Sequence, residues 1–225
     1  MKKLKFTPLQ IATHIGAWIP LAVGLWDLWH GNLGPDIIRA ATLRTGKTAL
    51  VLLVLSLACT PFNILFKYKP VLKLRRPLGL YAFMYASIHF AIFIGIDYFF
   101  NFKLIKGALL EKRYALVGLA TGLILLTLAL NSTDRSKRRL KKNWKRLHKL
   151  VYGAGVLAVI HFIWLVKQGV TEPWIWAGVV LLLLLIRLPV IKRLADRFRM
   201  HKGLRSWLSS QQWLRLTQSN KHDAP

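Results

Sequence analysis

Six long apolar stretches run through this chain, and they restrict the folds it can adopt more than any other feature. A helix needs about 20 apolar residues to cross the roughly 30 Å hydrocarbon core of a bilayer. Because lipid offers the backbone no hydrogen-bond partners, each stretch must be helical. The sequence therefore predicts an all-α fold, a polytopic bundle of six transmembrane helices over residues 1–192. Its apolar stretches cover roughly residues 8–29, 47–66, 78–99, 114–131, 147–167 and 173–191.

Lysine and arginine are distributed unevenly between the segments that connect these stretches. Of the 34 basic residues, 25 lie in the N-terminal head, in segments 67–77 and 132–149 and in the tail from Lys192, and only 8 lie in the alternate segments. The positive-inside rule places the richer set in the cytoplasm. We therefore expect both termini to be cytoplasmic, with residues 193–225 forming a basic tail at the inner membrane interface.

The net charge of +26 raises the question of nucleic-acid binding. The basic residues border apolar runs instead of lining one soluble face, so we expect membrane lipid as their partner and no nucleic acid. Arg75 and Arg76 belong to this cytoplasmic set. Topology and anionic lipid explain such residues, but a guanidinium also suits a flavin phosphate or a haem propionate. Both interpretations stay open from the residues alone.

Three histidines, His89, His148 and His161, lie inside or at the mouth of these apolar stretches. Ionisable residues in membrane spans are costly, so they indicate function. The predicted orientation places His89 and His161 in the middle or outer half of their spans, and His148 at the inner mouth. Two histidines at matched depth on facing helices can hold one iron between them. The alternative is that each imidazole only bonds to a neighbouring helix.

Other residues limit the kind of metal site. The single cysteine, Cys59, excludes an internal disulfide, a four-cysteine iron–sulfur cluster and covalent attachment of haem through C-x-x-C-H. Thirteen residues turn a helix by about 220°, so His148 and His161 do not share one face. Gly153 and Gly155, between them, suit either a close approach of haem or close helix packing.

Four runs together resemble a known family. They are TGKTALVLLVLSLACTPF (Thr45–Phe62), RRPLGLYAFMYASIHF (Arg75–Phe90), KRYALVGL (Lys112–Leu119) and WKRLHKLVYGAGVLAVIHFIWLVK (Trp144–Lys167). They are similar to the MsrQ family, formerly YedZ, within the ferric reductase-like transmembrane group. The resemblance covers nearly all of the chain up to about Arg193.

The resemblance implies one or two b-type haems and a bound FMN. It implies His89 and His161 as iron ligands and His148 as a third ligand, whose partner it leaves open. Arg75 stands fourteen residues before His89, where larger members carry a further histidine, and it cannot ligate iron. His14, in the inner half of the first span, is the remaining intramembrane candidate.

The segments on the predicted outer side, 30–46, 100–113 and 168–172, are too short for a substrate-sized catalytic domain. Likewise, the tail from Arg193 cannot contain domains for FAD and NAD(P)H. No nucleophile and base pair is evident, so we assign no catalytic residue. The chain is expected to conduct electrons, while a partner reduces the substrate.

The resemblance implies the path of those electrons. They would come from the quinone pool or a cytoplasmic flavin reductase, cross the bacterial inner membrane, and reach the periplasmic molybdopterin enzyme MsrP, which repairs methionine sulfoxide. Two alternatives remain open. One is a stand-alone haem-dependent metal or quinone reductase. The other is a non-haem transporter or structural subunit, although no inverted repeat typical of transporters is evident.

Overall fold

The computed structural model describes residues 7–166 and 169–189, together with 191 and 193. Within those residues it contains helices and turns but no strand, which confirms the all-α prediction. The chain divides into two compact units, residues 1–184 and 185–225. Every helix below lies in the first unit, apart from the last residue of α9. The predicted tail lies almost entirely outside the described residues, so its boundary at residue 193 stays a prediction.

In the described part of the chain, six longer helices carry the apolar stretches: α1 (Pro8–Trp29), α2 (Ile37–Phe66), α3 (Arg75–Ala91), α5 (Arg113–Leu130), α8 (Leu150–Leu165) and α9 (Glu172–Leu185). Five shorter elements connect or extend them: η1 (Lys69–Leu74), η2 (Ile92–Asp97), α4 (Phe102–Glu111), α6 (Asp134–Leu140) and α7 (Lys142–Leu147). η1 is a 3₁₀-helix and η2 is a π-helix.

Five helical segments of the described chain are long and apolar enough to cross a membrane. They are α1, α2, the continuous run from η1 to η2, α5, and α7 with α8. The protein is therefore a multi-pass membrane protein. α9 is apolar but has 14 residues, fewer than a usual span. The count of six spans and the cytoplasmic position of both termini stay predictions.

α2 begins at Ile37, ten residues before the apolar stretch that predicted it. Asp36 caps its first turn, because its carboxylate accepts a hydrogen bond from the backbone N–H of Arg39. Arg44 lies in the added turns and Lys47 directly after them, and each is paired with a carboxylate, Asp27 and Glu172 respectively. Hydropathy alone misses these turns because their charged side chains lower the average.

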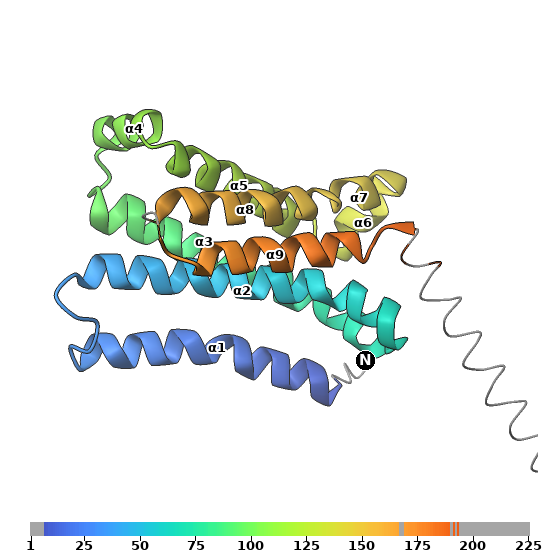
Figure 1. Cartoon of the computed structure of the whole chain (residues 1–225). Coiled ribbons are helices and arrows are strands. Elements are labelled where there is room, and N and C mark those ends of the chain that lie inside the picture. The colour runs from blue at the N-terminus through green and yellow to red at the C-terminus, as the bar shows by residue number, and fades with distance from the viewer. Residues whose placement is uncertain (1–6, 167–168, 190, 192, 194–225) are drawn as a thin grey trace, which may run out of the picture. The chain divides into compact units, whose positions relative to one another are not determined.

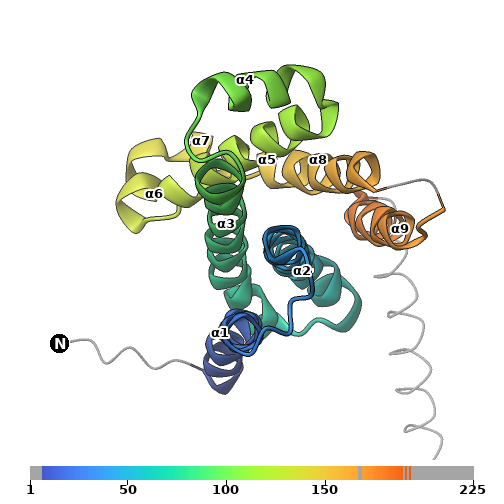
Figure 2. The ribbon, with the colours of Figure 1, turned by 90° about the vertical axis from the view of Figure 1, so that its left-hand side faces the viewer.

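Four helices form the centre of the bundle. α2 packs on α3, α3 on α5, α5 on α8, and α8 on α2, so the four close into a ring, and α1 packs against α2 and α3. Consecutive long helices run in opposite directions along the bundle (Figure 1), and an end-on view shows α1 beside the ring (Figure 2). Val180 of α9 joins a buried cluster with Leu50, Val54 and Val159.

Small residues let the central helices approach closely. Ala82 of α3 and Ala154 of α8 are fully buried. A Cβ atom added to Gly155 would lie 2.8 Å from Cδ1 of Leu57, so α8 and α2 are in contact at this glycine. Close packing therefore accounts for Gly155, as it does for small residues in many membrane bundles. Nothing lies within 4 Å of a Cβ added to Gly153.

α4 lies across the axis of the bundle, at the end where α5 begins (Figures 1 and 2). Asn101 caps it by accepting hydrogen bonds from the backbone N–H groups of Lys103 and Leu104. Its inner face buries Ile105 and Ala108. Its outer face exposes apolar and basic side chains, a pattern typical of a helix at a membrane interface.

Candidate haem-binding site

The rings of His89 and His161 lie next to each other inside the ring of four helices. His89 is on α3 and His161 on α8. Their ring centroids are 6.2 Å apart and their planes are nearly perpendicular, at 89°. The fold thus brings together, from opposite halves of the chain, the two histidines that the sequence placed at matched depth.

Each imidazole is oriented by a backbone carbonyl of a neighbouring helix. Nδ1 of His89 donates to the carbonyl oxygen of Thr42 at 2.8 Å, and Nδ1 of His161 donates to that of Tyr114 at 2.7 Å. A carbonyl oxygen only accepts, so Nδ1 carries the hydrogen in both rings and Nε2 keeps its lone pair. This is the tautomer that binds a metal through Nε2, with the second nitrogen fixed as in most metal-ligating histidines.

The separation of the two rings fits a single iron. With metal–nitrogen bonds of about 2 Å, two imidazoles that bound one iron from opposite sides would have their ring centroids roughly 6 to 6.5 Å apart. The observed 6.2 Å lies in that range. His89 and His161 therefore have both the donor atoms and the spacing of a bis-histidine haem site.

Two glycines make room for these rings. A Cβ atom added to Gly46 would lie 3.0 Å from Nδ1 of His89, and one added to Gly118 would lie 2.8 Å from Nδ1 and Cε1 of His161. Real Cβ atoms essentially never approach to 2.8 Å, so a side chain at Gly118 would displace the imidazole. Sequence reasoning missed both glycines, and no local motif distinguishes them from packing glycines.

The two halves of the site are built alike. Thr42 and Tyr114 each precede their histidine by 47 residues. Gly46 and Gly118 each follow that carbonyl residue by four positions. The segments around the histidines also match, Ala82, Ala86, Ile88, His89 and Phe90 corresponding to Ala154, Ala158, Ile160, His161 and Phe162.

This correspondence relates the helix pair α2–α3 to the pair α5–α8. α2 and α5 run in the same direction along the bundle (Figure 1), so the repeat is parallel and not inverted. Each pair supplies one imidazole, the carbonyl that orients it and the glycine beside it. The signal was present in the sequence as the repeated A-x-x-x-A-x-I-H-F.

His148 lies apart from this pair. Its Nδ1 donates to the carbonyl oxygen of Trp144 at 3.1 Å, and its ring stacks on that of Trp144 with centroids 3.9 Å apart. The charge of Arg75 acts on it electrostatically. His148 caps α7 and lies thirteen residues before His161, most of them in α8, which corresponds to about 20 Å of rise. No cluster of three or more His, Cys, Asp or Glu side chains occurs within the described residues.

The remaining sequence candidates also lie outside the pair. Arg75 and Arg76 are exposed at the start of α3, where the carbonyl of Arg75 accepts a hydrogen bond from Ser56. His14 is hydrogen-bonded through Nδ1 to the hydroxyl of Tyr81 at 2.9 Å. This bond links α1 to α3, as does the bond that Tyr85 donates to the carbonyl of Ala17.

Comparison with known proteins places the chain among the relatives that its sequence resembles. Residues 45–159 match the family described as the ferric reductase like transmembrane component. No solved structure matches the chain.

The similar proteins below are all named protein-methionine-sulfoxide reductase heme-binding subunit MsrQ. One from Xanthomonas euvesicatoria pv. vesicatoria (strain 85-10) is 42% identical over 76% of this chain and 81% of its own length. One from Xanthomonas campestris pv. campestris (strain 8004) is 39% identical over 87% and 92%. One from Rhodospirillum rubrum is 39% identical over 82% and 89%. Similarity of this extent, together with the matched transmembrane component, shows that the chain belongs to the MsrQ family of ferric reductase-like membrane proteins.

Proposed function

We propose that this protein is the haem-binding, electron-transferring membrane subunit of a methionine sulfoxide reductase system. The observation that carries the proposal is the pair His89 and His161, with perpendicular rings 6.2 Å apart and each Nδ1 bonded to a backbone carbonyl. The printed names of the relatives, which describe heme-binding subunits of that system, support it.

A b-type haem, when bound, supplies reversible one-electron chemistry between ferric and ferrous iron. The residues of this chain would hold and orient it. His89 and His161 would bind the iron through Nε2, and the carbonyl groups of Thr42 and Tyr114 would fix both rings and raise their basicity.

The proposed electron path runs from the quinone pool, or from a cytoplasmic flavin reductase, to the periplasmic molybdopterin enzyme MsrP. Its support is the shortness of the connections in the described chain, which are turns and short helices instead of a nucleotide-binding domain. Reduction of the sulfoxide to a thioether and water would take place on the partner. This path requires the bacterial inner membrane, because that membrane separates the cytoplasm from the periplasm.

A second haem at His148 and an FMN near Arg75 and Arg76 stay proposals from the resemblance. What supports the first is the position of His148, half-buried and stacked on Trp144 at the end of the bundle opposite α4. What supports the second is the exposure of both guanidinium groups at the start of α3, where a planar fork could pair with phosphate.

A reconstitution in liposomes tests the proposed function. The purified chain is combined with a reduced quinone in the lipid and with MsrP outside, and methionine is measured as it forms from a sulfoxide-containing peptide. We expect methionine only when all three parts are present, and none with His161→Ala. His30→Ala is the matched control, because His30 caps the C-terminal end of α1 and its ring stacks on that of Trp26. Equal methionine formation with and without the chain would contradict the proposal.

A further inference from the structure

An open cavity of about 460 Å³ lies where α4 gives way to α5. Glu111, Lys112, Arg113, Tyr114 and Trp164 line it. Two of its walls come from the junction of α4 and α5, and the third from the last turn of α8. The cavity therefore opens at the end of the bundle that α4 covers.

This cavity is in direct contact with the candidate haem site. Tyr114, which lines it, accepts the hydrogen bond from Nδ1 of His161 through its carbonyl oxygen at 2.7 Å. The rings of Tyr114 and His161 are also neighbours, with centroids 6.0 Å apart. One hydrogen bond thus connects an imidazole proposed to bind iron with the wall of a surface cavity.

In the other half of the repeat, the segment around Thr42, the counterpart of Tyr114, has a different arrangement of charges. There, Thr42 orients His89, and the cations that follow it on α2 are neutralised. Arg44 pairs with Asp27, and Lys47 pairs with Glu172 at 2.6 Å. The two cations that follow Thr42 are therefore paired within the chain, and Arg39, which precedes it, is the one cation of this segment with no ion pair among the described residues.

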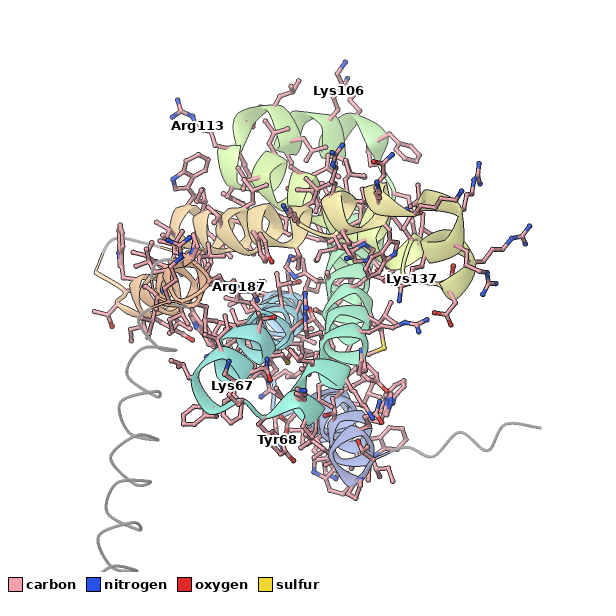
Figure 3. All side chains as sticks on the ribbon, turned by 90° about the vertical axis from the view of Figure 1, so that its right-hand side faces the viewer. Lys67, Tyr68, Lys106, Arg113, Lys137 and Arg187 are labelled. Atoms are coloured by element: carbon pink, nitrogen blue, oxygen red, sulfur yellow. The ribbon has the colours of Figure 1, made fainter. Side chains whose placement is uncertain are left out.

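Beside Tyr114 the cations are not neutralised. Lys112 donates to the uncharged hydroxyl of Tyr98 at 3.2 Å, and this hydrogen bond holds the pKa of Lys112 above its usual value, so the amine stays protonated at neutral pH. Lys106 and Arg113 point away from the helices (Figure 3). No ion pair involves any cation of this junction within the part of the chain that the structure describes, namely Lys103, Lys106, Lys112 and Arg113. The nearby acids are Glu111, which lines the cavity, and Asp97, so the surface keeps a net positive charge.

We propose that the junction of α4 and α5, centred on this cavity, is the docking surface for the electron acceptor, a soluble protein with an acidic docking face. The inference rests on the proposed function, since it needs an electron donor at His161 and an acceptor on this side of the membrane. Unpaired cations attract an acidic partner from a distance and set its orientation. The cavity then admits part of the acceptor to within one residue of His161.

The test reverses the charge of Lys106 and Arg113, which point away from the helices and form no ion pair with any described residue. The haem-loaded chain is placed in nanodiscs of uncharged, zwitterionic lipid, so that attraction to anionic lipid cannot account for any effect. The binding of purified MsrP is then measured for the unchanged chain, for Lys106→Glu with Arg113→Glu, and for Arg138→Glu with Arg139→Glu. The last pair, on α6, is at the opposite end of the bundle and matches the first in charge.

We expect the Lys106 and Arg113 variant to bind MsrP at least tenfold more weakly at low salt, about the size of a strong steering effect. The difference should shrink as salt rises, and the α6 variant should bind like the unchanged chain. The haem spectrum should be identical in all three, which shows that each is folded. Equal binding by both variants, with haem present, would overturn the docking surface alone. Absence of haem from the unchanged chain would instead overturn the proposed function.

Discussion

The ring of His89 stands perpendicular to that of His161, with 6.2 Å between their centroids. Each ring is turned to this position by a carbonyl group on another helix, that of Thr42 for His89 and that of Tyr114 for His161. The arrangement therefore depends on four helices at once. Any change that shifts α2 or α5 relative to its histidine should be visible at the haem.

Gly118→Ala should damage the haem site without removing a ligand. Its Cβ would lie 2.8 Å from two atoms of the His161 ring, so the imidazole must move. We expect a clear loss of haem per polypeptide, or a shifted haem band. Gly122→Ala is the control, since it is one turn along α5 and nothing lies within 4 Å of its added Cβ. Identical haem content in the two variants would show that the contact at Gly118 is unimportant.

Gly46→Ala should have a smaller effect of the same kind. The nearest atom to its added Cβ is Nδ1 of His89 at 3.0 Å, so a displacement of a few tenths of an ångström would relieve the contact. We expect haem to be retained, with its reduction potential shifted, and a redox titration measures this. A Gly46→Ala variant that loses more haem than Gly118→Ala would contradict the order of the two contacts.

The perpendicular rings predict a particular magnetic signature. Two parallel imidazoles interact through their π electrons with the same iron d orbital and separate it in energy from its partner, whereas two perpendicular imidazoles affect both orbitals nearly equally. Haem held by His89 and His161 at 89° should therefore give a strongly anisotropic low-spin ferric signal in electron paramagnetic resonance. A rhombic low-spin signal of the parallel type would show that the rings rotate when the iron binds.

His14→Ala should retain the full haem signal. Its imidazole is bonded to the Tyr81 hydroxyl, which joins α1 to α3. Interhelical hydrogen bonds in membranes contribute about 0.6 kcal/mol on average, so we expect only a modest loss of thermal stability. Tyr81→Phe removes the same bond and should match it. If His14→Ala loses haem while Tyr81→Phe keeps it, His14 is a ligand and not a packing residue.

His148→Ala should remove only part of the haem signal, because His148 lies about 20 Å of helix rise from the His89 and His161 pair. The quantity to measure is haem per polypeptide, compared with His89→Ala. A complete loss, equal to that of His89→Ala, would mean that all three histidines form one interdependent site.

Much of this architecture could be predicted from the sequence because lipid imposes it. Apolar stretches of membrane length must be helical, and matched depth selects His89 and His161 from seven histidines. The start of α2 could not be predicted from hydropathy, since Arg39 and Arg44 lower the average over its first turns. Arg44 and Lys47 are paired with Asp27 and Glu172 respectively. These partners come from α1 and α9, so only the folded bundle shows them.

The surroundings of the histidines were harder to predict. A backbone carbonyl has no sequence signature, so Thr42 and Tyr114 could not be chosen as the groups that orient the rings. Gly46 and Gly118 look like any other glycine in a membrane helix. The matching positions in the two halves were the available signal, because they relate the segment before His89 to the one before His161. Matched depth selected the two candidate ligands, whereas the groups that support them are visible only in the packed helices.

The central claim is that His89 and His161 hold a haem between them, and a reduced-minus-oxidised visible spectrum tests it most directly. Haem is quantified per polypeptide in the detergent-purified chain and in the variants His89→Ala and His161→Ala. The account predicts a sharp low-spin b-type band in the unchanged chain, and loss of the main band in both variants. A chain grown with ample haem that shows no such band, or a band that survives both substitutions, would contradict it.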